Sequence, residues 1–408
     1  MAVGTFPFPD IKPVPGLRLG TAQAGIRYKN RDDLLILELA EGATVGGVFT
    51  QNAFCAAPVI IARNHLQRSQ GKVRYLVINA GNANACTGEQ GKSNAIAVCR
   101  AIASSRGVEP HQVLPFSTGV VGEQLPVEKI ISALPEVFDG MVEARWSDAA
   151  KAIMTTDTRP KGATVEFDFN GEVIRVGGIA KGVGMIKPNM ATMLAFIGTN
   201  IGMSQAVVDQ LVRAAAEQSL NRIVVDGDTS TNDACMLMAT GQSNLPAIDK
   251  PGGELYQRVS AAITDVFLQL ARNLVCDGEG ATKYVTVKVT GGASQQECAK
   301  VAYAVAQSPL VKTAFYASDP NWGRIVVAIG YADVEQLDPS KVSVFLDQVQ
   351  IVDCGQRAQS YTEAQGQAVM NQHEITITIH LGRGDCCHHV WTTDFSHEYV
   401  TINAEYRT

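Results

Sequence analysis

The sequence predicts a mixed α/β protein with antiparallel hairpins, and three local patterns carry this prediction. Apolar residues alternate on either side of Asn170-Gly171, which is typical of a hairpin with a type I′ turn. Apolar residues in 259–274 recur every three or four positions, as in an amphipathic helix. Residues 284–290 alternate polar and apolar side chains, as in a strand with one buried face. Elements mixed in this way differ from a regular parallel βαβ array.

Shorter signals predict the elements before the hairpin. Residues 1–20 are Pro-rich and predict a polar arm, and residues 35–49 and 73–79 are rich in strand-forming side chains, which predict strands. Residues 79–88 are Gly, Asn and other small residues, which fit a tight loop or the start of a helix. The small and apolar residues of 93–106 then predict a packed helix.

The chain after the hairpin continues the mixed pattern. Residues 188–208 are uncharged but contain Pro, Asn and Gly, so they predict a buried, irregular segment rather than a membrane helix. A helix is expected near 295–307, before strands near 342–352 and 373–381. A domain boundary is expected near 280–290, after a Gly-rich loop.

Length, composition and charge narrow the function classes. The 408 residues suggest two or three domains, and 46% apolar with 18% charged residues excludes a disordered chain or a fibre. A net charge of −6 without a basic block argues against nucleic-acid binding. No secretion signal is visible, and the nine Cys are odd in number without CxxC spacing, so we expect a cytoplasmic protein with free thiols.

Common catalytic and metal motifs are missing from the sequence. Residues 177–184 are Gly-rich but lack the spacing of a phosphate-binding loop, and no GxSxG motif is present. The cluster Cys386–His389 combines metal-binding residue types, but neighbouring residues on a strand point to opposite faces. We therefore expect no metal site there, but a solvated strand end.

The shortage of conventional bases leaves a hydroxyl nucleophile that needs no His. Thr192 is such a candidate, because a Thr at a chain N-terminus can use its own α-amino group as the base. This chemistry requires cleavage of the bond before Thr192, which its own hydroxyl could attack.

Residues 178–200 (GIAKGVGMIKPNMATMLAFIGTN) resemble the self-cleaving ornithine acetyltransferase/glutamate N-acetyltransferase family of arginine biosynthesis. Further blocks match in family order across nearly the whole chain: residues 47–52, 79–88, 117–120, 155–158, 225–233, 318–324 and 402–408.

The resemblance implies a mixed α/β sandwich of the self-processing N-terminal-nucleophile-like type, with a smaller C-terminal α/β domain. It also implies cleavage between Ala191 and Thr192. Residues 1–191 would then form an α chain and residues 192–408 a β chain, of which about 285–408 would form the smaller domain. Two α–β pairs would associate.

The implied reaction moves an acetyl group from N2-acetyl-L-ornithine to L-glutamate through an acetyl-Thr192 intermediate, by a ping-pong mechanism. Thr118 and Gly119 would form the oxyanion hole. Family positions that bind substrate correspond to Thr155, Lys181, Thr192, Glu279, Asn403 and Thr408.

The residue types suit these substrates. Lys181 fits an α-carboxylate, and Glu279 fits the terminal ammonium of ornithine. Lys181 would also lower the pKa of the Thr192 amine. Thr156 is the alternative to Thr155 as a substrate contact. No cofactor or metal is expected, and acetyl-CoA is a candidate co-substrate because some members of the family accept it.

Two alternatives stay open at the level of the sequence. One is a related self-processing aminopeptidase or amidase, in which water replaces glutamate as the acceptor. The other is a non-catalytic chain that self-associates or senses a ligand, for which cleavage before Thr192 would serve no purpose.

Overall fold

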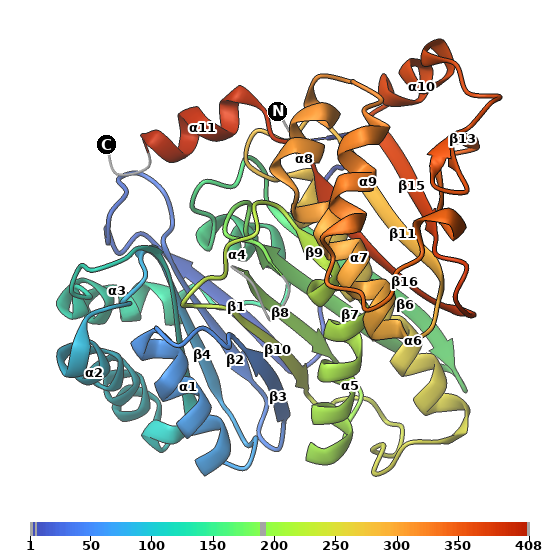
Figure 1. Ribbon diagram of the computed structural model, residues 1–408. Coiled ribbons are helices and arrows are strands. Elements are labelled where there is room, and N and C mark those ends of the chain that lie inside the picture. Colours follow the sequence, from blue (N-terminus) through green and yellow to red (C-terminus); the bar gives the residue numbers. More distant parts are fainter. Residues whose placement is uncertain (1–2, 5, 188–192, 406–408) are drawn as a thin grey trace.

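Two sheets packed face to face occupy the centre of the molecule (Figure 1). The structure is a computed structural model and describes residues 3–4, 6–187 and 193–405. The first sheet has the strand order β1-β2-β4-β5, and the second has the order β3-β10-β8-β7-β6. Their strands are β1 (Leu17–Ala22), β2 (Leu34–Leu39), β4 (Tyr75–Asn82), β5 (Val113–Val120), β3 (Thr44–Phe49), β10 (Ala234–Ala239), β8 (Leu194–Thr199), β7 (Glu172–Lys181) and β6 (Lys161–Phe169).

Each of these sheets carries helices on its outer face. Inner side chains of β1 and β2 pack against those of β8 and β10. The other face of β2 and β4 packs on α2 and α3, whereas the outer face of the second sheet packs on α5 and α6. This helix–sheet–sheet–helix sandwich confirms the predicted mixed α/β class. The helices of this part are α1 (Ala57–Arg68), α2 (Gly88–Arg106), α3 (Val127–Asp139), α4 (Trp146–Ala152), α5 (Gln205–Gln218) and α6 (Gly253–Cys276).

A third sheet has the order β14-β13-β12-β15-β11-β16-β9 and a core of its own with α7, α8 and α9. Its strand β9 precedes residue 280, whereas its other strands follow that residue. The elements are β9 (Ile223–Val224), β11 (Tyr284–Gly292), α7 (Gln295–Gln307), α8 (Pro309–Tyr316), α9 (Trp322–Gly330), β12 (Ser343–Leu346), β13 (Val349–Asp353), β14 (Gln356–Arg357), α10 (Glu363–Met370), β15 (Glu374–His380), β16 (Cys386–Thr393) and α11 (His397–Ala404). The division into processed chains and a domain from about residue 285 stays a prediction.

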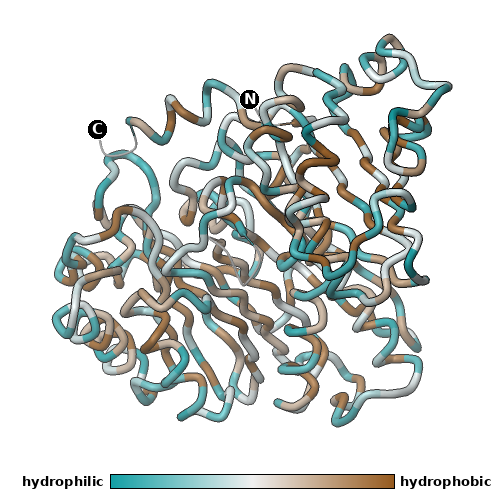
Figure 2. The backbone as a smooth tube through the Cα atoms, in the orientation of Figure 1, coloured by the Kyte–Doolittle hydropathy of each residue, from teal (hydrophilic) through white to brown (hydrophobic). Residues whose placement is uncertain are grey.

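Hydrophobic residues concentrate on the central strands and on the inward faces of the helices (Figure 2). Among the described helices, α6 alone is long and apolar enough to cross a membrane, and 56% of its most apolar stretch is buried in the molecule. Its apolar face packs on β6, β7 and α5 as a core helix.

Elements with strong local signals are confirmed. The hairpin turn joins β6 to β7 through Asn170 and Gly171, which have φ values of 54° and 83°, as a type I′ turn requires. The helix predicted over 259–274 is the inner part of α6, and the helix over 295–307 is α7.

Three interpretations need correction. Residues 35–49 form two strands rather than one, with a turn at Gly42 between them. The predicted arm is partly core, because Ile11 and Val14 are buried. Residues 194–199, expected to be irregular, form the buried strand β8, and α5 follows from Gln205. A strand buried on both faces lacks the polar–apolar alternation that would reveal it in the sequence.

Candidate active site

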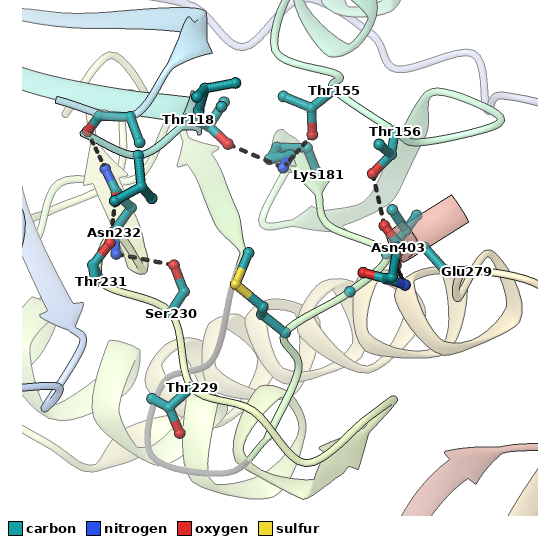
Figure 3. Close-up of a pocket in the computed structure, with 17 residues that line it drawn as sticks. Thr118, Thr155, Thr156, Lys181, Thr229, Ser230, Thr231, Asn232, Glu279 and Asn403 are labelled. Atoms are coloured by element: carbon teal, nitrogen blue, oxygen red, sulfur yellow. Dashed lines mark hydrogen bonds between the residues drawn. The ribbon is translucent and has the colours of Figure 1, made fainter. Parts of the chain in front are cut away.

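A cavity of about 320 Å³ lies at the ends of β5 and β7, beside the loops that follow β9 and α6 (Figure 3). Six of the predicted site residues line it: Thr118, Gly119, Thr155, Lys181, Glu279 and Asn403. Ala191, Thr192 and Thr408 lie outside the described residues. The structure therefore brings together predicted site residues from positions 118 to 403 of the chain, whereas their roles stay predictions.

Lys181 ends strand β7 and is buried, with 3% of its surface exposed. Its Nζ donates hydrogen bonds to the Oγ1 atoms of Thr118, at 3.1 Å, and Thr155, at 2.9 Å. Burial lowers the pKa of Lys181, and neighbouring carboxylates, of which Asp157 has the largest effect, oppose this shift. Within the described residues Lys181 forms no ion pair, so its charge is available to an anion in the cavity.

Glu279 supplies the opposite charge from the loop after α6. Its Oε1 accepts a hydrogen bond from Thr156 Oγ1 at 3.0 Å, and its Oε2 accepts one from Asn403 Nδ2 at 2.8 Å. Burial raises the pKa of Glu279, and the bonds from Asn403 and Thr156 partly offset this. These partners are neutral, so the carboxylate can serve a ligand ammonium. Asn403 reaches it because α11 brings the end of the described chain back to the cavity (Figures 1 and 3).

The backbone conformation and close packing at position 119 require a glycine. Its φ is 133°, and a Cβ added there would lie 2.3 Å from the carbonyl carbon of Gly81 on the neighbouring strand β4. An Ala at this position would disturb the pairing of β4 with β5. A Gly119→Ala variant would therefore report on packing and could not isolate an oxyanion donor.

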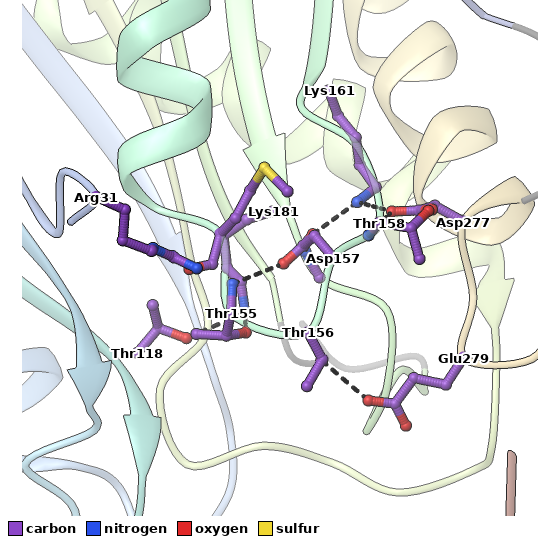
Figure 4. Close-up of polar contacts among 12 residues, drawn as sticks. Arg31, Thr118, Thr155, Thr156, Asp157, Thr158, Lys161, Lys181, Asp277 and Glu279 are labelled. Atoms are coloured by element: carbon purple, nitrogen blue, oxygen red, sulfur yellow. Dashed lines mark hydrogen bonds and ion pairs between the residues drawn. The ribbon is translucent and has the colours of Figure 1, made fainter. Parts of the chain in front are cut away.

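A buried ion cluster lies beside Thr155 and Lys181, which line the cavity (Figure 4). Lys161 Nζ lies 2.6 Å from Asp157 Oδ1 and 2.6 Å from Asp277 Oδ2, and all three side chains have 0% exposure. Asp157 also accepts backbone N–H bonds from Thr155 and Gly182. Burial would raise the pKa of Asp157, but the charges of the neighbouring lysines outweigh this effect and hold it below its usual range.

This cluster joins the three segments that carry Thr155, Lys181 and Glu279. Asp157 holds Thr155 and the residue after Lys181, and Asp277 lies two residues before Glu279 in the chain. Sequence reasoning did not single out Asp157, Lys161 or Asp277. These charged residues lie in segments that are otherwise rich in Gly and Thr, and this contrast in the sequence could have drawn attention to them.

The loop 225–233 forms another wall of the cavity, which Thr229 to Asn232 line. Asn232 Nδ2 donates to the carbonyl oxygens of Ala83, at 2.7 Å, and Ser117, at 2.9 Å. These bonds fix the loop against β5, directly before Thr118.

The Cys386–His389 cluster lies on β16. Cys387 is exposed, but the His388 and His389 rings pack beside Tyr303 and Trp391, so this strand end is only partly solvated. No group of three or more His, Cys, Asp or Glu that could hold a metal occurs within the described part of the chain.

Comparisons with known proteins identify the family of the chain. The chain is 57% identical over 408 residues to the arginine biosynthesis bifunctional protein ArgJ of Pseudomonas syringae pv. tomato, with 100% of both chains covered. The crystal structure of arginine biosynthesis bifunctional protein ArgJ from Bacillus halodurans is 32% identical, with a TM-score of 0.49 over 51% of this chain and 97% of that chain. An L-aminopeptidase D-Ala-esterase/amidase from Ochrobactrum anthropi, described as a variant of the Ntn hydrolase fold, is 12% identical, with a TM-score of 0.41 over 67% of this chain and 89% of that chain. The model of the ArgJ family matches residues 18–408. The chain therefore belongs to the ArgJ family.

Proposed function

We propose that this protein transfers an acetyl group from N2-acetyl-L-ornithine to L-glutamate and so produces L-ornithine and N-acetyl-L-glutamate. The observation that carries the proposal is the pair of buried, opposite charges, Lys181 and Glu279, which line one cavity and have neutral hydrogen-bond partners. Acetylornithine carries a carboxylate and an ammonium, which match these two groups. Membership of the ArgJ family, whose Pseudomonas relative is named for arginine biosynthesis, supports the same reaction.

The proposed chemistry begins with cleavage at Ala191-Thr192, which frees the α-amino group of Thr192. This amine takes the proton of the Thr192 hydroxyl as its oxygen attacks the acetyl carbonyl. Thr118 and Gly119 would stabilise the oxyanion. The C–N bond then breaks, the proton passes to the α-nitrogen of the leaving ornithine, and the acetyl group remains on Thr192 as an ester.

The second half-reaction repeats the sequence with glutamate as nucleophile. Its amine attacks the ester, the Thr192 oxygen leaves and recovers a proton, and N-acetylglutamate departs. Both substrates have an α-carboxylate, so Lys181 would serve both halves. Thr155 and Asn403 would complete the substrate contacts, together with Thr408.

We further propose that no cofactor takes part and that acetyl-CoA is a candidate second acetyl donor. A cavity of about 320 Å³ suits the acetyl end of that molecule rather than its whole length. The proposed enzyme is cytoplasmic, and its α and β chains associate as two α–β pairs.

The test combines intact mass measurement under denaturing conditions with an acetyl-exchange assay. The wild-type chain should give two fragments, the second of which begins at Thr192, and should form N-acetylglutamate only when glutamate is supplied. Thr192→Ala should stay one chain and be inactive. Acetate release that does not depend on glutamate would instead establish the amidase alternative, and an uncut, inactive wild-type chain would refute the proposal. A parallel reaction with acetyl-CoA replacing acetylornithine decides whether that donor is used.

A further inference from the structure

The loop 225–233 between β9 and β10, together with Ala234 at the start of β10, contacts the chain on both sides of the predicted cleavage junction. On the upstream side, Asp226 accepts backbone N–H bonds from Met185, at 2.6 Å, and Ile186, at 3.0 Å. The N–H of Val225 donates to the carbonyl oxygen of Ile186 at 2.8 Å. The loop thus fixes the residues that lead into the junction.

On the downstream side, the same loop fixes Met193. Asp233 Oδ1 accepts the N–H of Met193 at 3.0 Å, and the N–H of Ala234 donates to the Met193 carbonyl oxygen at 3.1 Å. Met193 is bonded covalently to Thr192, the predicted nucleophile. The backbone immediately after the nucleophile is therefore held from two directions.

Burial of the Asp233 carboxylate costs folding free energy, although it holds only one backbone amide of the segment after the junction. Its residue exposure is 1%, and its Oδ2 makes no hydrogen bond with any residue that the structure describes. Burial raises its pKa well above the usual value, which the Met193 N–H, the charge of Lys181 and the nearby Ser230 hydroxyl only partly oppose. A buried carboxylate with few partners among the described residues costs folding free energy, so its place beside Met193 points to a role at the junction.

Asn232 links this loop to β5, the strand that carries the predicted oxyanion-hole residues Thr118 and Gly119. Its Nδ2 donates a hydrogen bond to the carbonyl oxygen of Ser117, one residue before Thr118. A single loop therefore sets the position of the two flanks of the junction relative to the strand that would stabilise the oxyanion.

We propose that Asp233 is a positioning residue for self-cleavage: it holds the N–H of Met193, the residue that follows the proposed nucleophile in the chain, and the rate of attack on the Ala191–Thr192 bond depends on this contact. This inference rests on the proposed function. In the cleavage step the Thr192 oxygen bonds to that carbon, the C–N bond breaks and the hydroxyl proton passes to the new amine. Water then hydrolyses the ester. An intramolecular attack of this kind depends on atoms held about 3–3.5 Å apart, and a displacement of about 1 Å can cost about 100-fold in rate.

The test follows the conversion of full-length precursor to two fragments over time. Asp233→Leu keeps the approximate shape but removes the acceptor, and should slow cleavage by about 100-fold or more. Asp233→Asn keeps an acceptor oxygen for Met193 and should cleave within about 10-fold of the wild-type rate. Asp228→Ala, an exposed carboxylate of the same loop, is the matched control and should cleave like wild type.

Cleavage of Asp233→Leu at the wild-type rate would overturn the inference and leave the proposed function standing. If thermal unfolding shows that Asp233→Leu does not fold, Asp233→Ala decides in its place, with the same expected rate loss. Equal loss in the Asn and Leu variants would also overturn it, because the acceptor would then not be the property that matters. A wild-type chain that is never cut would instead refute the proposed function itself.

Discussion

Two buried lysines lie at neighbouring strand ends and have opposite surroundings. Lys161 begins β6 and pairs with Ala180, the residue before Lys181 at the end of β7. Lys161 meets two carboxylates, each at 2.6 Å, whereas Lys181 meets two hydroxyl groups and the cavity. The same residue type is thus neutralised within the fold at one position and left with an unpaired charge at the other.

This difference separates a structural charge from a functional one. A buried ion that is paired and hydrogen-bonded is tolerated because its partners replace the lost water. A buried ion with only neutral partners lowers the free energy of unfolding. Such ions are typical of functional sites, where a ligand of opposite charge can bind. Lys161 should therefore matter for stability and Lys181 for substrate.

The largest expected effect on stability comes from Lys161→Met. This change leaves Asp157 and Asp277 buried without their cation, and breaking a buried pair in this way costs about 3–5 kcal/mol. Urea unfolding followed by circular dichroism should show a midpoint well below that of the wild type.

The control for Lys161 is a triple variant, Lys161→Met with Asp157→Asn and Asp277→Asn, which removes all three charges together. It should recover part of the lost stability, because no uncompensated ion remains. A single Lys161→Met variant as stable as wild type would show that the cluster does not support the fold.

The contrast between the two lysines also shows what the sequence could predict. The hairpin turn and the inner part of α6 have local signals, and both were predicted. The resemblance to a family selected Lys181, but Asp277 lies 116 residues from Lys161, and no local pattern joins them. Asp233 likewise acts on Met193 from 40 residues away. Residues that hold a site through distant contacts become visible only in the fold.

The second prediction concerns Lys181→Met. Removal of the cation should lower kcat/KM for acetylornithine by about 100- to 1000-fold, since a charge-assisted contact to the substrate carboxylate is lost. Stability at neutral pH should stay equal or rise. The reason is that the lowered pKa of Lys181 means that folding disfavours its charged form. A destabilised variant with normal kinetics would reverse the assignment of the two lysines.

The third prediction, with the smallest expected effect, concerns Glu279, the anionic counterpart of Lys181. Glu279→Gln should lower kcat/KM for acetylornithine by about 10- to 100-fold, because a hydrogen bond to a charged group contributes about 1.5–3 kcal/mol. The amide keeps a similar shape and can still contact Thr156 and Asn403. A substrate of the same length without the terminal ammonium should be affected much less by this change, which separates charge recognition from packing.

The pH profile sharpens this test. The pKa of Glu279 is raised from 4.5, chiefly by burial, so the carboxylate that binds the ammonium is lost as pH falls through a value above 4.5. The wild-type kcat/KM should therefore decline on the acid side at a higher pH than an exposed Glu would cause, and Glu279→Gln should lack this limb. The sign for stability is opposite: a raised pKa in the folded state means that folding favours the protonated form, so ionised Glu279 costs stability at neutral pH. Glu279→Gln should thus unfold at an equal or higher urea concentration while binding substrate less well. An acid limb that persists unchanged in Glu279→Gln would assign that titration to another group and remove Glu279 from ammonium recognition.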